Sequence, residues 1–268
     1  MPEGHTIHRL ARDLLRAFGR RPVVASTLQE RFAHGAALLD GATMTRTQAH
    51  GKHLFVTFRA DRPADRCLHV HLGLYGKFPI HPLPAAEPRG ALRLRLENDT
   101  RWADLRGPTA CELISPIERD AILARLGPDP LRADADPDRA WKRISRSTMP
   151  VGALLMAQDV LSGIGNVYRA EVLFRHRINP YREGRAITHI EWDAIWADLC
   201  LLLRGGVRAG RIVTTLPQDR PRRGRPRRDD AFYVYRRAGE PCRVCGTDIR
   251  TAVLASRNLF WCPGCQRV

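Results

Sequence analysis

Four cysteines near the end of the chain constrain its fold most tightly. Cys242 and Cys245 form one C-x₂-C pair, and Cys262 and Cys265 form a second pair after sixteen intervening residues. Two pairs at this spacing place four thiolates for tetrahedral coordination of Zn²⁺. Because every ligand position is sulfur, no position remains open for water, and we expect one structural Zn²⁺ per chain. A matched pair of motifs is atypical of a redox centre, and a disulfide framework is disfavoured in a cytosolic chain.

The residues between the two cysteine pairs predict a β-hairpin. Segments 250–254 and 258–261 read as its strands, with Arg257 at the tip. The remaining cysteines lie in apolar runs, where a thiol behaves as a small hydrophobic group. We expect this of Cys67, Cys111 and Cys200.

The first half of the chain predicts one helix and a set of short strands. Apolar residues recur at helical spacing from a start near Thr6. They are Ile7, Leu10, Ala11, Leu14, Leu15 and Phe18. Segments 54–58, 67–72 and 92–96 alternate or are β-branched and are interrupted by Gly and Pro, which is typical of a β-sandwich.

The second half predicts helices at 150–161 and 166–175, and a third helix that follows a capping box formed by Thr188 and Glu191. The apolar face of this third helix predicts core packing rather than a platform for stacking bases. It comprises Trp192, Ile195, Trp196, Leu199, Leu202 and Leu203. Between the halves, the Pro- and Asp-rich segment 127–138 predicts an interdomain linker.

The net charge of +16 predicts a polyanionic partner. Of the 44 basic residues, all but Lys52, Lys77 and Lys142 are Arg. Arginine suits phosphates and bases, although codon bias in a GC-rich genome explains the preference equally well. Six Arg within 220–228 form a basic loop in segment 217–230. This loop is either a solvated linker or a segment that closes over nucleic acid.

The composition excludes other classes of protein. With 44% hydrophobic residues the chain can bury a core, so overall disorder is excluded. No apolar stretch approaches the roughly 20 residues that a membrane span needs, and the charged first twenty residues do not resemble a signal peptide. We expect a cytoplasmic protein without a membrane partner.

Six histidines in the first half invite a metal hypothesis. They are His5, His8, His50, His53, His69 and His71. No carboxylate accompanies them at ligand spacing, so we interpret them as ordinary polar or hydrogen-bonding residues.

The N-terminal sequence Met1-Pro2-Glu3 offers a nucleophile. Removal of Met1 exposes the secondary amine of Pro2, and an α-amino group has a reference pKa near 8, well below that of lysine. The positive end of the following helix depresses the pKa of such an amine further, and Glu3 supplies a carboxyl for acid–base chemistry. Taken alone, Pro-Glu at an N-terminus is usually only the start of a helix.

Several further motifs accompany this N-terminus in a characteristic order. They are Pro2-Glu3-Gly4, Gly51-Lys52, the His-Leu-Gly-Leu-Tyr-Gly of 71–76, the Gly-Ile-Gly-Asn-Val-Tyr of 163–168 with the following Arg-Ala-Glu-Val-Leu, and the four-cysteine finger with Arg257. In order and spacing this set resembles the formamidopyrimidine-DNA glycosylase and endonuclease VIII family over nearly the whole chain. The family excises oxidised bases and then cuts the DNA strand.

The resemblance implies catalytic roles for four residues. Pro2 matches the amine that attacks C1′ of the flipped nucleotide and forms a Schiff base, and Glu3 matches the carboxyl that helps to open the sugar. Lys52 matches a lysine that contacts the lesion phosphate and assists β-elimination; its alternative is a surface charge. Arg257 matches the finger arginine that grips phosphate and assists δ-elimination.

The resemblance also implies DNA contacts. Asn166 matches the asparagine of the helix-two-turn-helix motif. Gly73, Leu74 and Tyr75 occupy the loop that fills the void left by the flipped base; otherwise Leu74 and Tyr75 form a core pair at a strand end. Arg125 matches a DNA-contacting arginine or neutralises a helix C-terminus.

The substrate branch depends on a short segment around Arg106. The formamidopyrimidine branch usually carries Arg-Arg-Phe-Gly there, whereas this chain has Asp-Leu-Arg-Gly-Pro at 104–108 and lacks the Phe. The resemblance therefore favours the endonuclease VIII branch and oxidised pyrimidines. Excision of 8-oxoguanine-type purines is the alternative, and a non-catalytic damaged-DNA-binding or RNA-binding protein is the other; neither binding protein has a use for the N-terminal Pro-Glu.

The expected architecture is α+β and multidomain, in a monomer that binds damaged DNA at the bacterial nucleoid. We expect an N-terminal β-sandwich catalytic domain at 1–128 and a linker with a lead-in helix at 129–149. A helix-two-turn-helix DNA-binding domain at 150–238, which includes the basic loop, and a zinc finger at 239–268 complete the chain.

Overall fold

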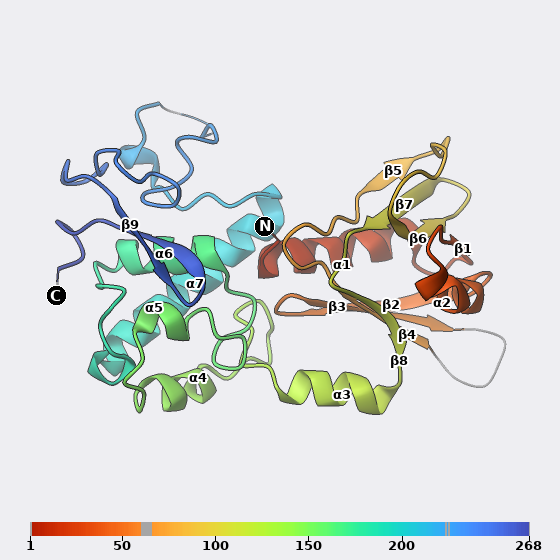
Figure 1. The fold of residues 1–268 in the computed structure, drawn as a ribbon, viewed down its shortest axis with the longest axis horizontal. Helices are drawn as coiled ribbons and strands as arrows, with labels where there is room; N and C mark the ends of the chain where they lie inside the picture. The colour runs from red at the N-terminus through yellow and green to blue at the C-terminus, as the bar shows by residue number, and fades with distance from the viewer. Residues whose placement is uncertain (1, 60–65, 223, 225, 268) are drawn as a thin grey trace. The chain divides into compact units, whose positions relative to one another are not determined.

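The computed structural model describes residues 2–59, 66–222, 224 and 226–267, and the chain divides into two compact units. The first unit is Met1–Arg125 and the second is Leu126–Val268. Figure 1 shows that strands dominate the first unit and helices the second. Within the described ranges, no helix is long and apolar enough to span a membrane.

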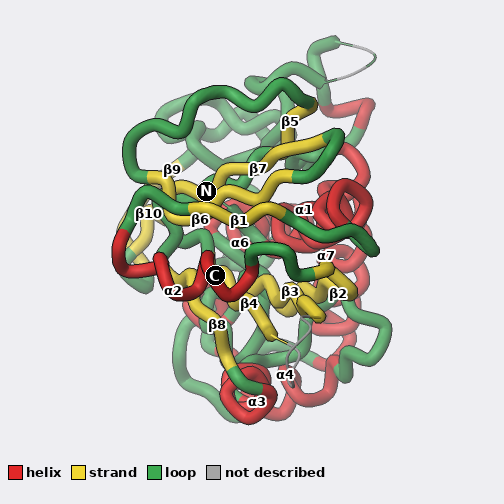
Figure 2. Tube along the Cα trace, turned by 90° about the vertical axis from the view of Figure 1, so that its right-hand side faces the viewer, coloured by secondary structure: helices red, strands yellow, loops and turns green. Residues whose placement is uncertain are grey.

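The first unit is a sandwich of two antiparallel four-stranded sheets, as the strand pattern predicts. The sheets lie one above the other in Figure 2. One has the order β2-β3-β4-β8, with β2 at Thr43–His50, β3 at His53–Arg59, β4 at Arg66–His71 and β8 at Ala110–Ile114. The other has the order β1-β6-β7-β5, with β1 at Val24–Ser26, β6 at Leu92–Glu97, β7 at Arg101–Arg106 and β5 at Ile80–Pro82.

Helix α1 (Gly4–Phe18) packs its apolar stripe against this sandwich. Ile7, Leu14 and Phe18 are fully buried and join one core cluster with residues of β3. The helix begins at Gly4, earlier than expected, and Leu15 is 39% exposed, so the buried stripe is narrower than the apolar pattern indicates. The unit also contains a 3₁₀ turn (Glu30–Phe32), α2 (Ala33–Leu39) and α3 (Pro116–Ala124).

The second unit is helical. Its helices are α4 (Pro137–Ile144), α5 (Val151–Leu154), α6 (Asn166–Arg175) and α7 (His189–Ala209), with 3₁₀ turns at Gly184–Ala186 and Pro217–Asp219. The bounds of α6 are those predicted, and α7 starts with the predicted capping box of Thr188 and Glu191. Trp192 of α7 is buried and Trp196 is half-buried, so this aromatic stripe is core.

The helix predicted at 150–161 is wrong, because α5 ends at Leu154. The chain continues in turns with i→i+3 hydrogen bonds, such as Met156 N–H to Ala153 C=O at 3.0 Å. The Gln158 side chain serves as a local partner for this folded segment and accepts a hydrogen bond from Gly163 N–H at 3.1 Å. The Gln158 C=O accepts another from Gly127 N–H at 2.9 Å. These contacts replace the helical pattern that apolar spacing alone favours.

The first part of the Pro- and Asp-rich segment after α3 is packed, whereas Asp134, Asp136 and Asp138 farther along it are exposed. Residues 126–130 are buried, and Ser162 N–H bonds Pro128 C=O at 3.0 Å. A Cβ at Gly127 would overlap the backbone of Val160, so a side chain cannot replace the hydrogen there without a backbone shift. Residues 126–130 thus form a buried part of the second unit.

The chain ends in the predicted hairpin of β9 (Arg250–Leu254) and β10 (Arg257–Trp261). The two turn residues, Ala255 and Ser256, have φ of +53° and +56°. This is the type I′ requirement, which Asn and Gly usually meet because they tolerate positive φ. Arg257 is the first residue after the turn.

Candidate nucleic-acid interface and metal centre

The closed end of the β2–β3 hairpin presents Lys52. His50 pairs with His53 across a two-residue turn of Gly51 and Lys52. Gly51 has a φ of +58°, which suits the first position of a II′ turn and explains the glycine before the lysine. Lys52 is half-buried at this turn. The turn and the start of α1 both lie at the left-hand end of the first unit in Figure 1.

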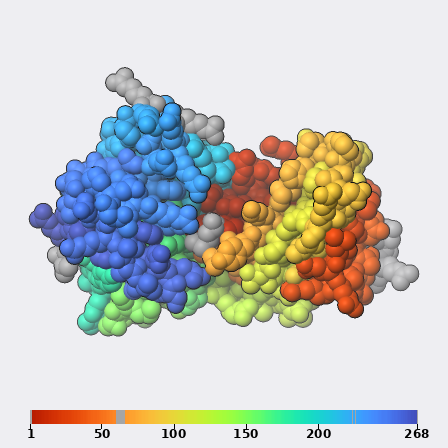
Figure 3. Space-filling model, turned by 45° about the horizontal axis from the view of Figure 1, so that its top comes forward, coloured from red at the N-terminus to blue at the C-terminus, as the bar shows by residue number. Residues whose placement is uncertain are grey.

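The loop at 72–76 follows β4 at the same end of the sheet, because His53 pairs with His71. Gly76 N–H closes the loop on Leu72 C=O at 2.9 Å, and a Cβ at Gly73 would overlap the Thr109 hydroxyl. Leu74 is 43% exposed and Tyr75 is 83% exposed, which excludes a core pair. In Figure 3 the orange segment that includes this loop lies at the surface of the first unit.

Arg106 borders this loop but already has protein partners. Lys77 N–H bonds Arg106 C=O at 3.0 Å, which places 72–76 beside the β7–β8 connection. The Arg106 guanidinium pairs with Asp104 at 2.7 Å, and Arg95 holds the same carboxylate with bonds of 2.7 and 3.0 Å. Although burial opposes it, these arginines hold the pKa of Asp104 below its usual range. A DNA contact from Arg106 stays a prediction.

Pro2 and Glu3 precede α1. Glu3 occupies the N-cap position with extended backbone and is completely buried, while Pro2 is half-buried. The Glu3 C=O accepts a hydrogen bond from Thr6 N–H at 2.9 Å, which closes the first turn of the helix. Arg125 is exposed at the C-cap of α3, a position compatible with both of its predicted roles.

In the second unit, Asn166 ties α6 to the C-terminal hairpin. Its side-chain amide donates to Asn258 C=O at 2.7 Å, and its carbonyl accepts from Arg169. Arg169 is completely buried and also reaches Leu254 C=O at 3.2 Å. Asn166 is thus at a junction with the hairpin that carries the exposed Arg257.

Sequence reasoning did not assign a role to Arg169. Its position three residues after Asn166 on the same helix face was the available signal, since residues at this spacing are neighbours. Buried arginines are nonetheless rare in folded proteins, so the residue type alone predicts an exposed side chain.

The four predicted ligand cysteines come together. Their sulfur atoms all lie within 4.8 Å of one another, with Cys242 and Cys265 at 3.9 Å and Cys245 and Cys262 at 3.4 Å. Tetrahedral Zn²⁺ with Zn–S bonds of about 2.3 Å needs sulfur separations of roughly 3.8 Å, so these residues fit the ion. By contrast, burial raises the pKa of Cys67, Cys200 and Cys111, the last to about 12, which suits inert thiols.

A buried carboxylate, Glu171, anchors the end of the basic loop. Its carboxylate accepts from Tyr233 N–H at 2.8 Å, Val234 N–H at 2.9 Å and Tyr235 N–H at 2.8 Å, and also from the Thr214 hydroxyl. Residues on either side of 216–230 are thereby fixed to α6. Nothing in the sequence pattern predicts this anchor.

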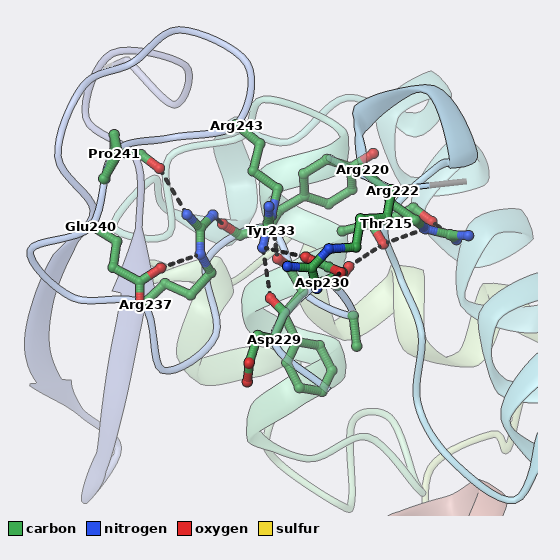
Figure 4. A network of polar contacts seen from close by, with 12 residues as sticks. Thr215, Arg220, Arg222, Asp229, Asp230, Tyr233, Arg237, Glu240, Pro241 and Arg243 are labelled. Carbon is green, nitrogen blue, oxygen red and sulfur yellow. Dashed lines mark hydrogen bonds and ion pairs between the residues drawn. The ribbon is translucent and has the colours of Figure 1, made fainter. Parts of the chain in front are cut away.

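A second set of contacts, drawn in Figure 4, joins the two ends of the basic loop to the folded unit. The Thr215 hydroxyl donates to Asp230 C=O at 2.7 Å, and Arg243 donates to Asp229 C=O at 2.6 Å. Thr215 also accepts from Arg220 at 2.9 Å. The loop therefore leaves and re-enters the second unit at one fixed point. Two of its arginines, at 223 and 225, lie outside the described residues.

One histidine of the first unit, His69, has a carboxylate partner that is distant in sequence, in keeping with the interpretation of these histidines as hydrogen-bonding residues. His69 Nδ1 lies 2.9 Å from Glu112 Oε1, because β4 pairs with β8 and sets His69 opposite Glu112. The two residues are far apart in sequence, so ligand spacing along the chain gave no sign of the contact.

A β-sandwich followed by a helical domain and a four-cysteine hairpin defines a class of DNA-repair glycosylase. Three family models match in this order: the formamidopyrimidine-DNA glycosylase N-terminal domain at 1–111, its H2TH domain at 126–218, and the zinc finger found in FPG and IleRS at 239–268. The chain belongs to the formamidopyrimidine-DNA glycosylase and endonuclease VIII family. It is a DNA glycosylase with AP lyase activity.

Relatives cover the whole chain. Endonuclease 8 1 of Mycobacterium tuberculosis is 50% identical over 99% of this chain and 100% of its own length. Formamidopyrimidine-DNA glycosylase of Symbiobacterium thermophilum is 32% identical over 100% of this chain and 90% of its own length. A Lactococcus lactis FPG mutant bound to Fapy-dG-containing DNA has the same fold, with a TM-score of 0.81, 23% identity and complete coverage of both chains.

Proposed function

We propose that this enzyme removes oxidised bases, with oxidised pyrimidines favoured, from damaged DNA in base excision repair. The observation that carries the proposal is the joint presence of Pro2 and Glu3 before α1 with Lys52 on the closed end of the β2–β3 hairpin. A non-catalytic DNA-binding or RNA-binding protein has no need of this set.

The proposed chemistry starts at Pro2, once Met1 is removed. Its secondary amine attacks C1′ of the damaged nucleotide and the glycosidic bond breaks, with the electron pair leaving on the base. The proton of the Pro2 amine leaves with the anionic base. The nitrogen lone pair then opens the C1′–O4′ bond to give an iminium ion, and Glu3 supplies the proton that the ring oxygen takes up.

Elimination then cuts the strand. Loss of a proton from C2′ expels the 3′ phosphate in the β step, and a second elimination expels the 5′ phosphate in the δ step. Lys52 neutralises the lesion phosphate in the first step, and Arg257 grips phosphate in the second. Both are charged side chains on tight hairpins, which favours precise placement.

The preference for pyrimidines rests on the β7–β8 connection. Only residues 107–109 separate these strands, so no aromatic side chain projects there for reading the base opposite the lesion. The name Endonuclease 8 1 of the 50% identical relative points the same way. Purine excision of the 8-oxoguanine type is the second candidate, favoured by the 32% identical formamidopyrimidine-DNA glycosylase.

DNA contacts complete the proposal. Leu74 and Tyr75, exposed on the loop that starts with Gly73, fill the space of the flipped base and offset part of the unstacking cost of a few kcal/mol. Arg106, Arg125 and Asn166 are proposed to hold flanking phosphates. We assign these functions to a catalytic domain at 1–128, a linker with lead-in helix at 129–149, a DNA-binding domain at 150–238 and a finger at 239–268, within a monomer.

Borohydride trapping tests the nucleophile. The mature chain, beginning at Pro2, is incubated with duplexes containing thymine glycol, dihydrouracil or 8-oxoguanine, and reduction captures any Schiff base. We expect a covalent adduct with the pyrimidine lesions first, and Pro2→Ala to weaken formation of the adduct while binding is retained. Binding without any adduct overturns the enzymatic mechanism, and a faster adduct with 8-oxoguanine selects the alternative substrate.

We further propose one structural zinc ion per chain, held by Cys242, Cys245, Cys262 and Cys265. Bound there, Zn²⁺ cross-links the finger and supplies no reactive position. Native mass spectrometry should show a single zinc, and Cys245→Ser should lose it. An active preparation without metal contradicts the assignment.

A further inference from the structure

Three strands of one sheet carry a hydrogen-bonded chain of side chains beside the Lys52 turn. His53 Nδ1 on β3 lies 2.9 Å from His69 Nε2 on β4, and His69 Nδ1 lies 2.9 Å from Glu112 Oε1 on β8. The rings of His53 and His69 are stacked with an interplanar angle of 11°, and the next ring, Phe55, stacks on His69 at 5.2 Å. The three residues form a continuous path from the turn to the half-exposed Glu112 carboxylate.

The chemistry of this path fixes the direction of its hydrogen bonds. An ionised carboxylate only accepts, so His69 donates from Nδ1 to Glu112. In neutral His69 the Nε2 atom is then a lone pair, and His53 must donate to it from Nδ1. One charged end group thereby sets the tautomer of two rings, in the way that a carboxylate orients a metal-bound or catalytic histidine.

The surroundings keep the rings of His53 and His71 neutral. Burial, followed by the nearby His71, His69, His50 and Arg125, lowers the pKa of His53 to about 3. Burial and Lys52 lower the pKa of His71. The carboxylate that the hydrogen bonds bring to this path is Glu112, and it contacts the far ring, His69.

Neither a metal site nor simple core packing fits this geometry. A metal site needs lone pairs that converge on one point, whereas the facing nitrogens of His53 and His69 bond each other; among the described residues only the four cysteines form a metal-ligand cluster. Apolar side chains are sufficient for core packing, as Leu54 and Val56 are on the other face of β3. Placing hydrogen-bonded polar side chains in this position has a free-energy cost that apolar side chains would not have.

The position of these three hydrogen-bonded side chains indicates their role. Strand β2 is at the edge of its sheet, so the closed end of the β2–β3 hairpin is supported by strand pairing on one side only. The link from His53 to His69 fastens the first residue after the turn to the interior of β4. His71, which pairs with His53, leads directly into the 72–76 loop.

We propose that His53, His69 and Glu112 form a positioning array that fixes the Lys52 turn relative to the 72–76 loop for strand cleavage. This inference rests on the proposed function, which uses Lys52 in elimination. The three residues are positioning residues: they act through the turn and need not touch the substrate.

Single-residue variants separate the two hydrogen bonds. Glu112→Gln keeps the shape of the side chain but adds a donor, so it no longer dictates the His69 tautomer. His69→Asn keeps a donor for Glu112 but loses the bond to His53, and His69→Gln does the reverse. His34→Gln, at an exposed position on α2, is the matched control.

The first readout is ¹⁵N NMR of the histidine rings in the full-length mature protein. We expect wild-type His53 and His69 each to hold the proton on Nδ1 at neutral pH, and Glu112→Gln to give a tautomer mixture. Rings that already exchange between tautomers in the wild type overturn the array without reference to activity.

The second readout is cleavage of a duplex with a preformed abasic site. We expect kcat for strand cleavage to fall about tenfold in Glu112→Gln and further in His69→Asn, with less loss in His69→Gln, while KM and duplex affinity change less than twofold. If the wild type cleaves and kcat is unaltered in Glu112→Gln and His69→Asn, the positioning role is refuted. Absence of cleavage by the wild type instead refutes the proposed function, so the two failures are distinct.

Discussion

The buried carboxylate of Glu171 is held mostly by partners that the backbone supplies. Glu171 receives three backbone N–H groups from 233–235 and the hydroxyl of Thr214. Burial raises the pKa of Glu171, and these four donors oppose that rise. The stability of this site therefore depends more on the carboxylate of Glu171 as a hydrogen-bond acceptor than on the volume of its side chain.

Replacing Glu171 by Gln should destabilise the protein by about 2 kcal/mol. The amide substitutes a donor for one acceptor, so at least one buried N–H loses its partner, at a cost of about 1–3 kcal/mol. Urea unfolding followed by circular dichroism measures the change. The exposed Glu30→Gln is the control, and equal stability of the two variants contradicts the role of Glu171 as an anchor.

Two histidines should make the protein less stable in acid. Burial lowers the pKa of His5 to about 4 and that of His53 to about 3, both below the unfolded value near 6.5. The unfolded chain therefore binds more protons as pH falls below 6.5, and stability falls by at most about 1.4 kcal/mol per pH unit for each histidine. Their contribution is fully present above pH 6.5.

Urea midpoints between pH 7 and 4 measure this dependence. His53→Phe, which preserves a ring for the stack with Phe55, should reduce the slope, whereas the exposed His34→Phe should leave it unchanged. An equal slope in both variants shows that His53 does not titrate as the structure indicates.

At the scale of elements, turns determine where the functional side chains are presented. Gly51 suits the turn that presents Lys52, but the β9–β10 turn places Ala255 and Ser256 at positive φ without glycine. A left-handed conformation costs an ordinary L-residue roughly 1–2 kcal/mol. The hairpin next to Arg257 is therefore held by its pairing and by the finger despite its turn residues.

Replacing the turn by Asn-Gly should stabilise the finger. Ala255→Asn with Ser256→Gly fits the type I′ geometry and should increase stability by about 1 kcal/mol, without loss of strand cleavage. Urea unfolding of the full-length protein, followed by circular dichroism, measures the change in stability. The reverse test is Ala255→Val with Ser256→Val, since β-branched residues resist positive φ, and a stabilised valine variant contradicts the assigned turn.

The two ends of the basic loop are also held by side-chain contacts. Contacts from Thr215, Asp230 and Arg243 hold the ends of 216–230 together, although the sequence between them contains Pro and Gly that favour an irregular path. The loop is therefore an arginine-rich segment on a fixed base.

For the whole molecule, the net charge of +16 predicts salt-dependent binding to DNA. Each phosphate neutralised contributes a slope of about −0.9 in log affinity against log salt. The exposed Arg227 and Arg228 of the basic loop test whether that segment contributes.

If the basic loop contacts phosphates, Arg227→Gln with Arg228→Gln should reduce the steepness of the salt dependence by about 1.8, because two counterion-releasing contacts are lost. Fluorescence anisotropy with undamaged duplex from 50 to 200 mM salt measures the slope. Arg31→Gln with Arg59→Gln, exposed in the first unit, is a charge-matched control. An unchanged slope in the loop variant assigns the loop to a solvated linker.

Much of the fold follows from local signals. The capping box at Thr188, the bounds of α6, the strand pattern of the first unit and the four cysteines are set by short-range chemistry, and each is found where predicted. The helix expected at 150–161 fails because the contacts that shorten it come from Gly127 and from the side chain of Gln158. Apolar periodicity carries no information about such partners.

The sequence by itself determined the family, the candidate metal ligands and the candidate nucleophile, since each depends on residue type and spacing along the chain. Only the tertiary structure decided which partners the carboxylates of Glu112 and Glu171 meet. His69 meets Glu112 because β4 pairs with β8, and Glu171 meets 233–235 because the chain returns to α6. Such contacts join residues far apart in sequence, and a hydrogen bond acts only over about 3 Å, so strand register and helix packing must be known before these pairs can be identified.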